Sequence, residues 1–435
     1  MRIHILGICG TFMGGLAQIL KESGHIISGS DIQFYPPMSD HLQDLEVEMT
    51  EGYSVSKMPK ADLYIIGNAL SRGNECVEHI LDKQLPFKSG PEMLGEILKN
   101  KKVIAVSGTH GKTTTSYMLT HIFLNQGRDI GFLVGGISKD IKVSASLGSD
   151  EVFVIEADEY DSAFFDKRSK FIHYSPSTVV INNIEFDHAD IFDDLKDIKR
   201  QFHHLIKIIP SSGNIIYFHE DENTNDVLSM GHWCNLAVIN NKDIKINFQS
   251  KELVNKEKLY SLGDLPLIGE HNFKNYVTAI LAANLHDIEI EDSIKALKSF
   301  NGVKRRLEYK GSYSNVLIYD DFAHHPTAIT FSSNAIRDKY PDKKILGLIE
   351  LGSNTMSGGS HGISLTDSAK ALDKVIWLDH NKTLSEISNV KLASKIDSFI
   401  DIAKLESIDH DIILLMTNKD SQKILRPLIN YLEKK

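Results

Sequence analysis

The residues best suited to do chemistry form a glycine-rich loop between a predicted strand at 103–106 and a predicted helix. They read Gly108-Thr109-His110-Gly111-Lys112-Thr113-Thr114. Glycines let backbone N–H groups approach phosphate oxygens, and the start of a helix adds positive partial charge. Lys112 can reach the β- and γ-phosphates of a nucleotide, and the Thr113 hydroxyl can ligate Mg²⁺. The pattern predicts a P-loop that binds ATP, in a shortened form because Val106 stands where the common motif has its first glycine.

A carboxylate and an imidazole stand where two further predicted strands, 152–155 and 178–181, come to an end. Glu156 closes the first strand, and three carboxylates follow within five residues: Asp158, Glu159 and Asp161. Such crowding is unfavourable unless a cation offsets it, and a strand-end carboxylate opposite a P-loop is an expected Mg²⁺ ligand. His188 can ligate a second divalent ion while Asp187 orients it. From spacing alone, a solvated acidic loop and a structural histidine stay open as alternatives.

The N-terminus carries a second glycine turn, which reads Gly7-Ile8-Cys9-Gly10-Thr11-Phe12-Met13-Gly14. The turn follows a predicted strand at 3–6 and opens a predicted helix at 12–23, which suits a pyrophosphate group. Asp31 ends the next predicted strand, where a ribose-binding acid would stand. The glycine spacing differs from the dinucleotide fingerprint. A nicotinamide-dependent oxidoreductase is therefore an alternative, as is a tight turn without a ligand.

Three later motifs place polar side chains at predicted strand and helix ends. The run Gly269-Glu-His271-Asn272-Phe-Lys-Asn275 can bond a purine edge or, alternatively, cap its own helix. Arg306, in the pair Arg305–Arg306, can offset charge on a transferring phosphoryl group, although a linker also suits a solvated basic pair. Asp321 and His324 can contact ribose or metal, or they can simply lead into a helix with Pro326 near its start.

These motifs need parallel sheets to bring them together, because the carboxyl ends of parallel strands share one edge. Short apolar strands alternate with helical patterns along the chain, which is typical of α/β folds. A composition shift near 98–102 and a linker near 301–304 predict three domains: 1–100, 101–302 and 303–435. The segment 213–265 departs from the alternation, and short irregular strands with turns are expected there.

Composition narrows the classes of function. The chain has 48 Lys and Arg against 58 Asp and Glu, so its net charge is 48 − 58 = −10, which disfavours nucleic acid as a partner. Its three cysteines lack metal or disulfide spacing, which fits a reducing compartment. Glycines interrupt the apolar N-terminus and no stretch approaches a membrane span in length. We therefore expect no signal peptide, no membrane insertion and a cytoplasmic location.

The motifs together carry a resemblance. In chain order they are GTHGKTTT, EADEYD, NNIEFDH, GEHNFKN and YDDFAHHPTA, and the chain resembles the Mur ligase family over essentially its full length. The resemblance implies an α/β architecture of three domains. The N-terminal domain would be Rossmann-like and bind UDP, the central domain would be a P-loop ATPase, and the C-terminal domain would be Rossmann-like and bind the acceptor.

Within the family, the chain looks most like the members that act in murein recycling. Three stretches are the basis: HILGICGTFMGGLA, EADEYDSAFFDKRSKF and YDDFAHHPTAI. The implied reaction joins L-alanyl-γ-D-glutamyl-meso-diaminopimelate, a murein tripeptide, to UDP-N-acetylmuramate at the expense of ATP, through an acyl phosphate. The implied cofactors are ATP and Mg²⁺, and the expected state is a monomer or a weak homo-oligomer. A UDP-N-acetylmuramate–L-alanine ligase, and a P-loop switch that uses hydrolysis to exchange partners, are alternatives.

The resemblance also implies roles for individual residues. The catalytic residues would be Lys112, Glu156, His188 and Arg306, and metal would be held by Thr113, Glu156 and His188. Besides the P-loop, ATP would contact His271, Asn272, Asn275, Asp321 and His324. The UDP-sugar would contact Gly10, Thr11, Gly14, Ser30, Asp31 and Asn68.

Two departures from the family pattern fall where the acceptor should dock. The run Glu350-Leu351-Gly352-Ser353-Asn354-Thr355-Met356 lacks a proline and an arginine that recycling ligases carry, and the tail Met416-Thr-Asn-Lys-Asp-Ser421 lacks a glycine-rich run. The identity of the acceptor is the expectation that these departures affect most.

Overall fold

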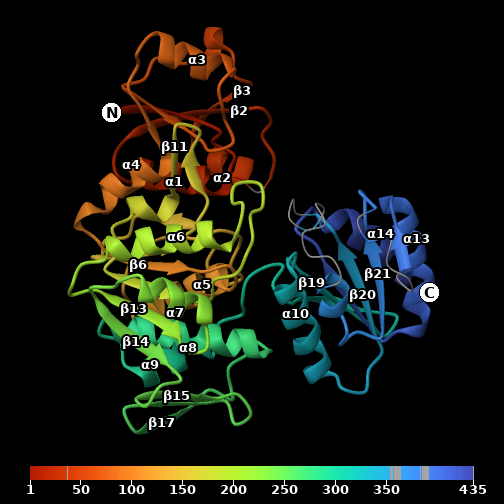
Figure 1. Cartoon of the computed structure of the whole chain (residues 1–435). Helices are drawn as coiled ribbons and strands as arrows, with labels where there is room; N and C mark the ends of the chain where they lie inside the picture. Colours follow the sequence, from red (N-terminus) through yellow and green to blue (C-terminus); the bar gives the residue numbers. More distant parts are fainter. Residues whose placement is uncertain (37, 353–355, 357–363, 383, 385–390, 435) are drawn as a thin grey trace. The chain divides into compact units, whose positions relative to one another are not determined.

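The first hundred residues form a five-stranded parallel sheet with helices between the strands (Figure 1). The computed structural model describes residues 1–435 except 37, 353–355, 357–363, 383, 385–390 and 435. The strand order is β3-β2-β1-β4-β5. The elements are β1 (Arg2–Leu6), α1 (Thr11–Glu22), β2 (Ile26–Asp31), α2 (Met38–Asp44), β3 (Glu48–Glu51), η1 (Val55–Lys57), β4 (Leu63–Ile66), α3 (Glu75–Asp82), β5 (Phe87–Ser89), α4 (Gly90–Ile97) and η2 (Leu98–Asn100).

The central segment forms a seven-stranded sheet whose neighbouring strands are parallel except for β7 and β8. The order is β14-β13-β12-β6-β9-β7-β8. The elements are β6 (Lys102–Ser107), α5 (Lys112–Asn125), β7 (Gly131–Leu133), β8 (Ala145–Ser146), β9 (Val152–Glu156), β10 (Asp161–Ala163), β11 (Asp166–Ser169), η3 (Lys170–His173), β12 (Thr178–Ile181), α6 (Leu195–Lys207), β13 (Asn214–Phe218), α7 (Glu222–Ser229), β14 (Asn235–Ile239), β15 (Ile244–Asn247), β16 (Glu252–Asn255), β17 (Lys258–Ser261), α8 (Glu270–Asn284) and α9 (Ile290–Leu297).

The register of the central sheet decides which strand ends meet. β6 lies between β9 and β12, with Val106 opposite Glu156 and Ser107 opposite Ile181. The apolar residues of all three strands are buried, as expected for parallel strands covered on both faces. The loop after β6 therefore lies between the carboxyl ends of β9 and β12.

The segment 213–265 is more regular than the sequence indicates. β13 and β14 extend the main parallel sheet, and the short helix α7 lies between them. Only β15, β16 and β17 form a separate antiparallel sheet. The expectation of irregular strands was wrong for α7, because this polar helix buries only Thr224, Val227 and Leu228 and so shows little apolar periodicity.

The C-terminal segment forms a six-stranded sheet with the order β18-β19-β23-β20-β21-β22, antiparallel only between β18 and β19. Alternate residues of β20 enter separate cores, since Ile345 and Ile349 pack on one face while Leu346 and Leu348 pack on the other. The elements are β18 (Glu308–Tyr313), β19 (Val316–Asp321), α10 (Pro326–Lys339), β20 (Ile345–Glu350), α12 (Ser364–Ser368), β21 (Lys374–Leu378), β22 (Lys391–Ala393), α13 (Ile396–Glu406), η4 (Ser407–Asp409), β23 (Ile412–Met416) and α14 (Gln422–Leu432).

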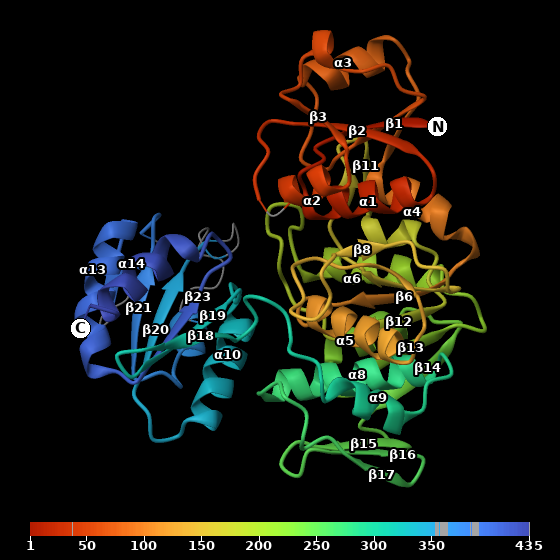
Figure 2. The same ribbon diagram turned by 180° about the vertical axis from the view of Figure 1, so that it is seen from behind.

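The chain divides into two compact units. The first comprises Met1–Phe186, Asp194–Leu265 and Asn275–Asn301, and the second comprises Asp187–Asp193, Pro266–Lys274 and Gly302–Lys435. Within the first unit α1 packs beside β8 of the central sheet (Figure 2). A Cβ added to Gly15 of α1 would lie 3.1 Å from the Cβ of Ala145 in β8. No helix in the described part of the chain is long and apolar enough to cross a membrane.

A bidentate ion pair between Arg128 and Asp150 stabilises the first unit. The Arg128 guanidinium donates to both carboxylate oxygens of Asp150, each at 2.8 Å, and to the His286 carbonyl oxygen at 2.9 Å. The hydrogen bonds from Arg128 lower the pKa of Asp150 from 3.8 to about 2. The stabilisation is therefore complete above the unfolded-state pKa near 3.8 and is lost as the pH falls through about 2.

We expect Arg128→Ala to lower the free energy of unfolding at pH 7 by about 2 kcal/mol, because bidentate bonds between charged groups are among the stronger ones. Urea denaturation at pH 7 and pH 3 measures the effect, and the difference from wild type should shrink at the lower pH. Lys102→Ala is the control, since it breaks a pair with Glu151 whose side chains are both more than half exposed. Equal losses in the two variants would contradict the assignment.

Candidate active site

The P-loop lies at the carboxyl edge of the central sheet, between the end of β6 and the start of α5. Gly108 and Gly111 have φ of 119° and 84°, in the left-handed region that favours glycine. A Cβ on Gly111 would lie 2.5 Å from Oδ1 of Asn275 and 2.8 Å from Nδ2 of Asn182. Glycine is thus required at position 111 by both conformation and space, and Asn275, predicted to contact ATP, lies directly against the loop.

Two asparagines after β12, for which no role was predicted, hold the P-loop. The His110 amide donates to Oδ1 of Asn183 at 2.9 Å, and the Thr109 amide donates to its carbonyl oxygen at 3.0 Å. Asn182 donates to the Thr115 hydroxyl at 3.3 Å. The sequence signal that could have indicated this role is the position of both asparagines at the end of β12, the strand beside β6.

Lys112 is a nearly buried cation held by acceptors of the central domain. Its Nζ donates to the Gly108 carbonyl oxygen at 2.6 Å and lies 3.1 Å from Oε2 of Glu159, which is 1% exposed. Burial acts to lower the pKa of Lys112, but the carboxylates of Glu159, Asp158 and Glu156 outweigh it and raise the pKa above its ordinary value. The ammonium therefore stays charged at the place where a triphosphate would bind.

Thr113 and Glu156 form the pair expected for a hard cation. The Thr113 hydroxyl donates to Oε1 of Glu156 at 2.7 Å, and the Gly135 amide donates to Oε2 at 2.7 Å. A hydroxyl and a carboxylate oxygen are ligands that Mg²⁺ prefers, and a divalent ion would offset the crowded negative charge of Glu156, Asp158 and Glu159. These residues fit the predicted Mg²⁺, although the metal roles stay a prediction.

The N-terminal turn places its predicted residues at the shared edge of β1, β2 and β4. Gly10 and Thr11 are exposed at the start of α1, and Asn68 follows β4 half-buried. A Cβ on Gly14 would lie 2.0 Å from Sδ of Met38, so glycine lets α2 approach α1. The start of α1 lies at this edge, and the first backbone N–H groups of a helix are not paired within the helix, which suits a diphosphate.

Asp31 and Ser30 already have partners within the N-terminal domain. Asp31 accepts hydrogen bonds from the amides of Cys9 and Ile32, each at 2.8 Å, and from the Tyr53 hydroxyl at 3.3 Å. Ser30 is buried, and its hydroxyl is 2.9 Å from Nε2 of His4. We therefore expect Asp31 to shape the glycine turn and Ser30 to fix the strand end, whatever contact either makes with a ligand.

The second unit holds six of the residues predicted to act at the nucleotide: His188, His271, Asn272, Arg306, Asp321 and His324. Asp187 is buried, which acts to raise its pKa, but the charges of His188, His324 and His325 and the His188 amide lower the pKa to about 2. His188 itself has φ of 56°, a strained backbone that occurs often at functional sites. The meeting of these residues with Lys112 and Glu156 stays a prediction.

Two of these side chains are fixed by local contacts in the second unit. Asp321 accepts from the amides of Leu307 at 2.6 Å and Ala323 at 2.7 Å, and its burial raises its pKa. The His271 ring stacks on Phe331, with ring centroids 5.5 Å apart and planes at 12°. Both are held in one orientation, which a binding role would require.

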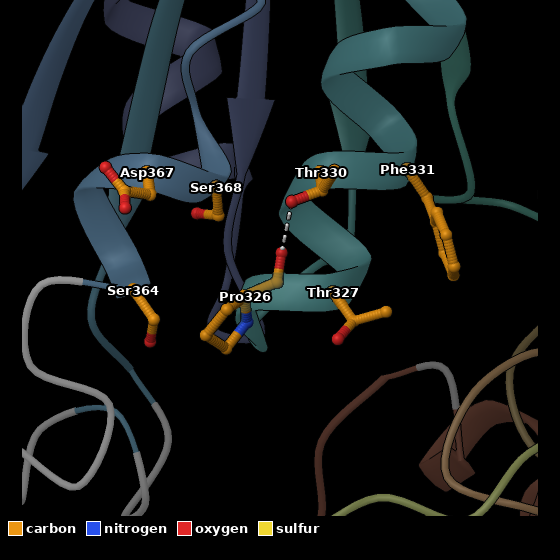
Figure 3. Close-up of a pocket in the computed structure, with 7 residues that line it drawn as sticks. All are labelled: Pro326, Thr327, Thr330, Phe331, Ser364, Asp367 and Ser368. Carbon is orange, nitrogen blue, oxygen red and sulfur yellow. Dashed lines mark hydrogen bonds between the residues drawn. The ribbon is translucent and has the colours of Figure 1, made fainter. Parts of the chain in front are cut away.

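A pocket of about 340 Å³ opens between α10 and α12 in the second unit (Figure 3). Hydroxyl groups of Thr327 and Ser364 and the ring of Phe331 line it. Its carboxylate, Asp367, is paired with Lys370 at 2.9 Å. The pocket can thus offer hydroxyl hydrogen bonds to a polar ligand.

The two sequence departures lie next to each other at the ends of β20 and β23. The Thr417 hydroxyl donates to Glu350, and a Cβ on Gly352 would lie 2.2 Å from Oδ1 of Asn418. Ser353, Asn354 and Thr355 lie outside the described residues. The two departures from the family pattern therefore fall in one place in the fold.

Three family models match successive parts of the chain. The first, "Mur ligase family, catalytic domain", matches 2–102; "Mur ligase middle domain" matches 106–283; and "Mur ligase, glutamate ligase domain" matches 305–418. The chain belongs to the Mur ligase family. The predicted family and the predicted architecture of three α/β Mur ligase domains are confirmed, while the boundaries 1–100, 101–302 and 303–435 stay our proposal.

Individual members of the Mur ligase family are similar to this chain over different shares of its length. The chain is 43% identical to UDP-N-acetylmuramate–L-alanyl-γ-D-glutamyl-meso-2,6-diaminoheptandioate ligase of Escherichia coli K12, over 100% of this chain and 99% of that protein. It is 35% identical to UDP-N-acetylmuramate–L-alanine ligase of Clostridium botulinum, over 79% of this chain and 75% of that one. The crystal structure of a murein peptide ligase from Psychrobacter arcticus superposes with a TM-score of 0.77 at 38% identity, covering 100% of this chain and 99% of that one.

Proposed function

We propose that this Mur ligase joins the murein tripeptide L-alanyl-γ-D-glutamyl-meso-diaminopimelate to UDP-N-acetylmuramate, with conversion of ATP to ADP and phosphate. The observation that carries the proposal is the 43% identity to a ligase of that name along the whole of both chains. The L-alanine ligase matches over a smaller part of each chain, so the tripeptide is the better-supported acceptor. The nicotinamide-dependent oxidoreductase is set aside because it leaves the P-loop without a purpose.

The residues of the first unit suit the first half of this reaction. The lactyl carboxylate oxygen of the sugar attacks the γ-phosphorus of ATP, the bond to the β-phosphate oxygen breaks, and an acyl phosphate and ADP form. Lys112, charged and fixed by Gly108 and Glu159, would stabilise negative charge on the transferring phosphoryl group. Mg²⁺, held by Thr113 and Glu156 with His188 as a further ligand, would supply additional positive charge at the phosphates.

The second half joins the peptide. The tripeptide's α-amine attacks the acyl carbonyl carbon, the new C–N bond forms, phosphate leaves, and the nitrogen gives up a proton. We propose that the C-terminal domain brings this amine and that Arg306, Asp321 and His324 complete the nucleotide site there. ATP and UDP-sugar as substrates favour a cytoplasmic location, and we propose a monomer or weak homo-oligomer as the working form.

The acceptor can be tested directly. The purified protein is incubated with ATP, Mg²⁺, UDP-N-acetylmuramate and either the tripeptide or free L-alanine, and the ligated product is measured by mass spectrometry. We expect product with the tripeptide at a kcat/KM at least ~10²-fold above that with L-alanine, because recognition of the longer acceptor adds binding energy. Preference for L-alanine would overturn the assignment of acceptor, and ATP turnover without either co-substrate would favour a P-loop switch.

A further inference from the structure

The segment between β9 and β12 links the sugar-binding domain to the ATP site. Its hairpin, β10 and β11, lies beside α4 of the N-terminal domain (Figure 1). Phe164 packs against the apolar cluster around Leu6 and Leu70, and the Phe165 ring meets Phe87 edge-on with centroids 5.0 Å apart. A Cβ on Gly95 of α4 would lie 2.2 Å from the His173 carbonyl oxygen, so the contact with η3 is also close.

The other end of this segment brings a second lysine to the carboxylates beside the P-loop. Lys170 donates to Oδ2 of Asp158 at 2.9 Å, and its Nζ lies 5.4 Å from the centroid of the Tyr160 ring. The Lys170 side chain is only 16% exposed. An ammonium has three N–H donors, so the bond to Asp158 leaves capacity for a further acceptor. The mechanism above gives this cation no role.

Tyr174 adds a donor that has no acceptor. The residue is 2% exposed, and among the described residues none forms a hydrogen bond with its phenolic oxygen. Burial and the nearby charge of Asp158 raise the pKa of Tyr174 well above its ordinary value, so the phenol keeps its proton. Its O–H group therefore needs an oxygen atom that accepts a hydrogen bond. A buried polar group without a partner is costly, which points to an atom that arrives with a ligand.

We propose that Lys170 and Tyr174 bind the carboxylate of the UDP-linked sugar and hold it for attack on the γ-phosphate. The inference rests on the proposed function and names the part of the site that receives this group. A cation and a neutral O–H donor suit a carboxylate, whereas the protonated amine of the acceptor would be repelled by Lys170. The location also fits, because the hairpin contacts the sugar-binding domain while Asp158 adjoins the carboxylates that face Lys112.

The test compares two ligands that differ in the lactyl group, which carries the carboxylate. UDP-N-acetylmuramate carries the lactyl group, and UDP-N-acetylglucosamine is the same nucleotide sugar without it. Calorimetric titration of wild type, Lys170→Met and Tyr174→Phe with each ligand needs no turnover. We expect Lys170→Met to weaken binding of the muramate roughly 10- to 100-fold and Tyr174→Phe roughly 3- to 10-fold, with binding of the glucosamine unchanged.

Controls separate a binding role from a structural one. Tyr174→Phe removes a buried hydroxyl without a partner, so its melting temperature should equal or exceed that of wild type while muramate binding falls. Tyr217→Phe, a buried tyrosine on β13, should alter neither ligand's affinity, and Lys170→Arg should retain more affinity than Lys170→Met. In steady-state assays the KM for ATP should stay within about twofold of wild type.

Three results would overturn the inference: unchanged muramate affinity in both variants, an equal loss for the two ligands, or a rise confined to the KM for ATP. A wild-type protein that binds the muramate more tightly than the glucosamine but forms no product would refute the proposed function and leave the carboxylate site standing.

Discussion

Replacing Lys112 with methionine reduces ligation at least ~10³-fold in kcat, because the transferring phosphoryl group loses a desolvated positive charge in the transition state. The Lys112 ammonium is fixed between Gly108 and Glu159, and methionine keeps the length of the apolar stem while removing the charge. The measurement is coupled-enzyme detection of ADP with all three substrates at saturation.

A loss of folding must be separated from a loss of chemistry in this variant. Glu159 is 1% exposed, and removing its cation would cost about 3 kcal/mol or more of stability, as for other buried charges that lose their partner. The double variant Lys112→Met with Glu159→Gln should recover the melting temperature but not the activity. Lys102→Ala, at the exposed start of β6, is the matched control and should leave kcat unchanged. Retention of ligation by a folded Lys112→Met would contradict the role assigned to this lysine.

The second large effect concerns Glu156. We expect Glu156→Gln to reduce kcat roughly 10²- to 10³-fold and to raise the Mg²⁺ concentration needed for half-maximal rate. The two oxygens of Glu156 accept from the Thr113 hydroxyl and the Gly135 amide, and glutamine removes the charge and turns an NH₂ group toward one of these donors. Initial rates are measured across a series of Mg²⁺ concentrations.

A second glutamate, next to the start of the same strand, provides the comparison. Glu151 stands just before β9 and its side chain is 58% exposed, so Glu151→Gln should match wild type in both rate and Mg²⁺ dependence. A Glu156→Gln enzyme whose activity falls without any change in the Mg²⁺ requirement would assign this residue to holding the P-loop instead of the metal.

The chemistry at strand ends was predictable because it depends on sheet topology. Apolar runs mark β6 and β9, and parallel strands bring their carboxyl ends together. Thr113 and Glu156 could therefore be expected to meet from sequence alone. The Thr113 hydroxyl oxygen lies 2.7 Å from Oε1 of Glu156. The family and the fold class followed from the order of several such motifs, and the family models confirm both.

Other features depend on contacts that no local pattern specifies. Lys170 bonds to Asp158, and Tyr174 comes under the influence of its charge, only because the chain folds back through a hairpin. The hairpin strands have three and four residues, which is too short for a periodic signal. His188 follows β12 in sequence, but its segment, Asp187–Asp193, clusters with the C-terminal unit, which strand order alone does not indicate. Its place beside the P-loop stays a prediction. The tertiary environment, rather than strand order, decides the position of such loops.

The transfer of the γ-phosphoryl group to the sugar's carboxylate can be followed with isotopically labelled substrate. UDP-N-acetylmuramate with ¹⁸O in both oxygens of its lactyl carboxylate is converted with ATP and the tripeptide, and the released phosphate is examined by mass spectrometry. If the carboxylate attacks the γ-phosphorus, one ¹⁸O atom per turnover must appear in the phosphate. Product formed with phosphate free of ¹⁸O would contradict an acyl phosphate and, with it, activation of the sugar's carboxylate at the P-loop.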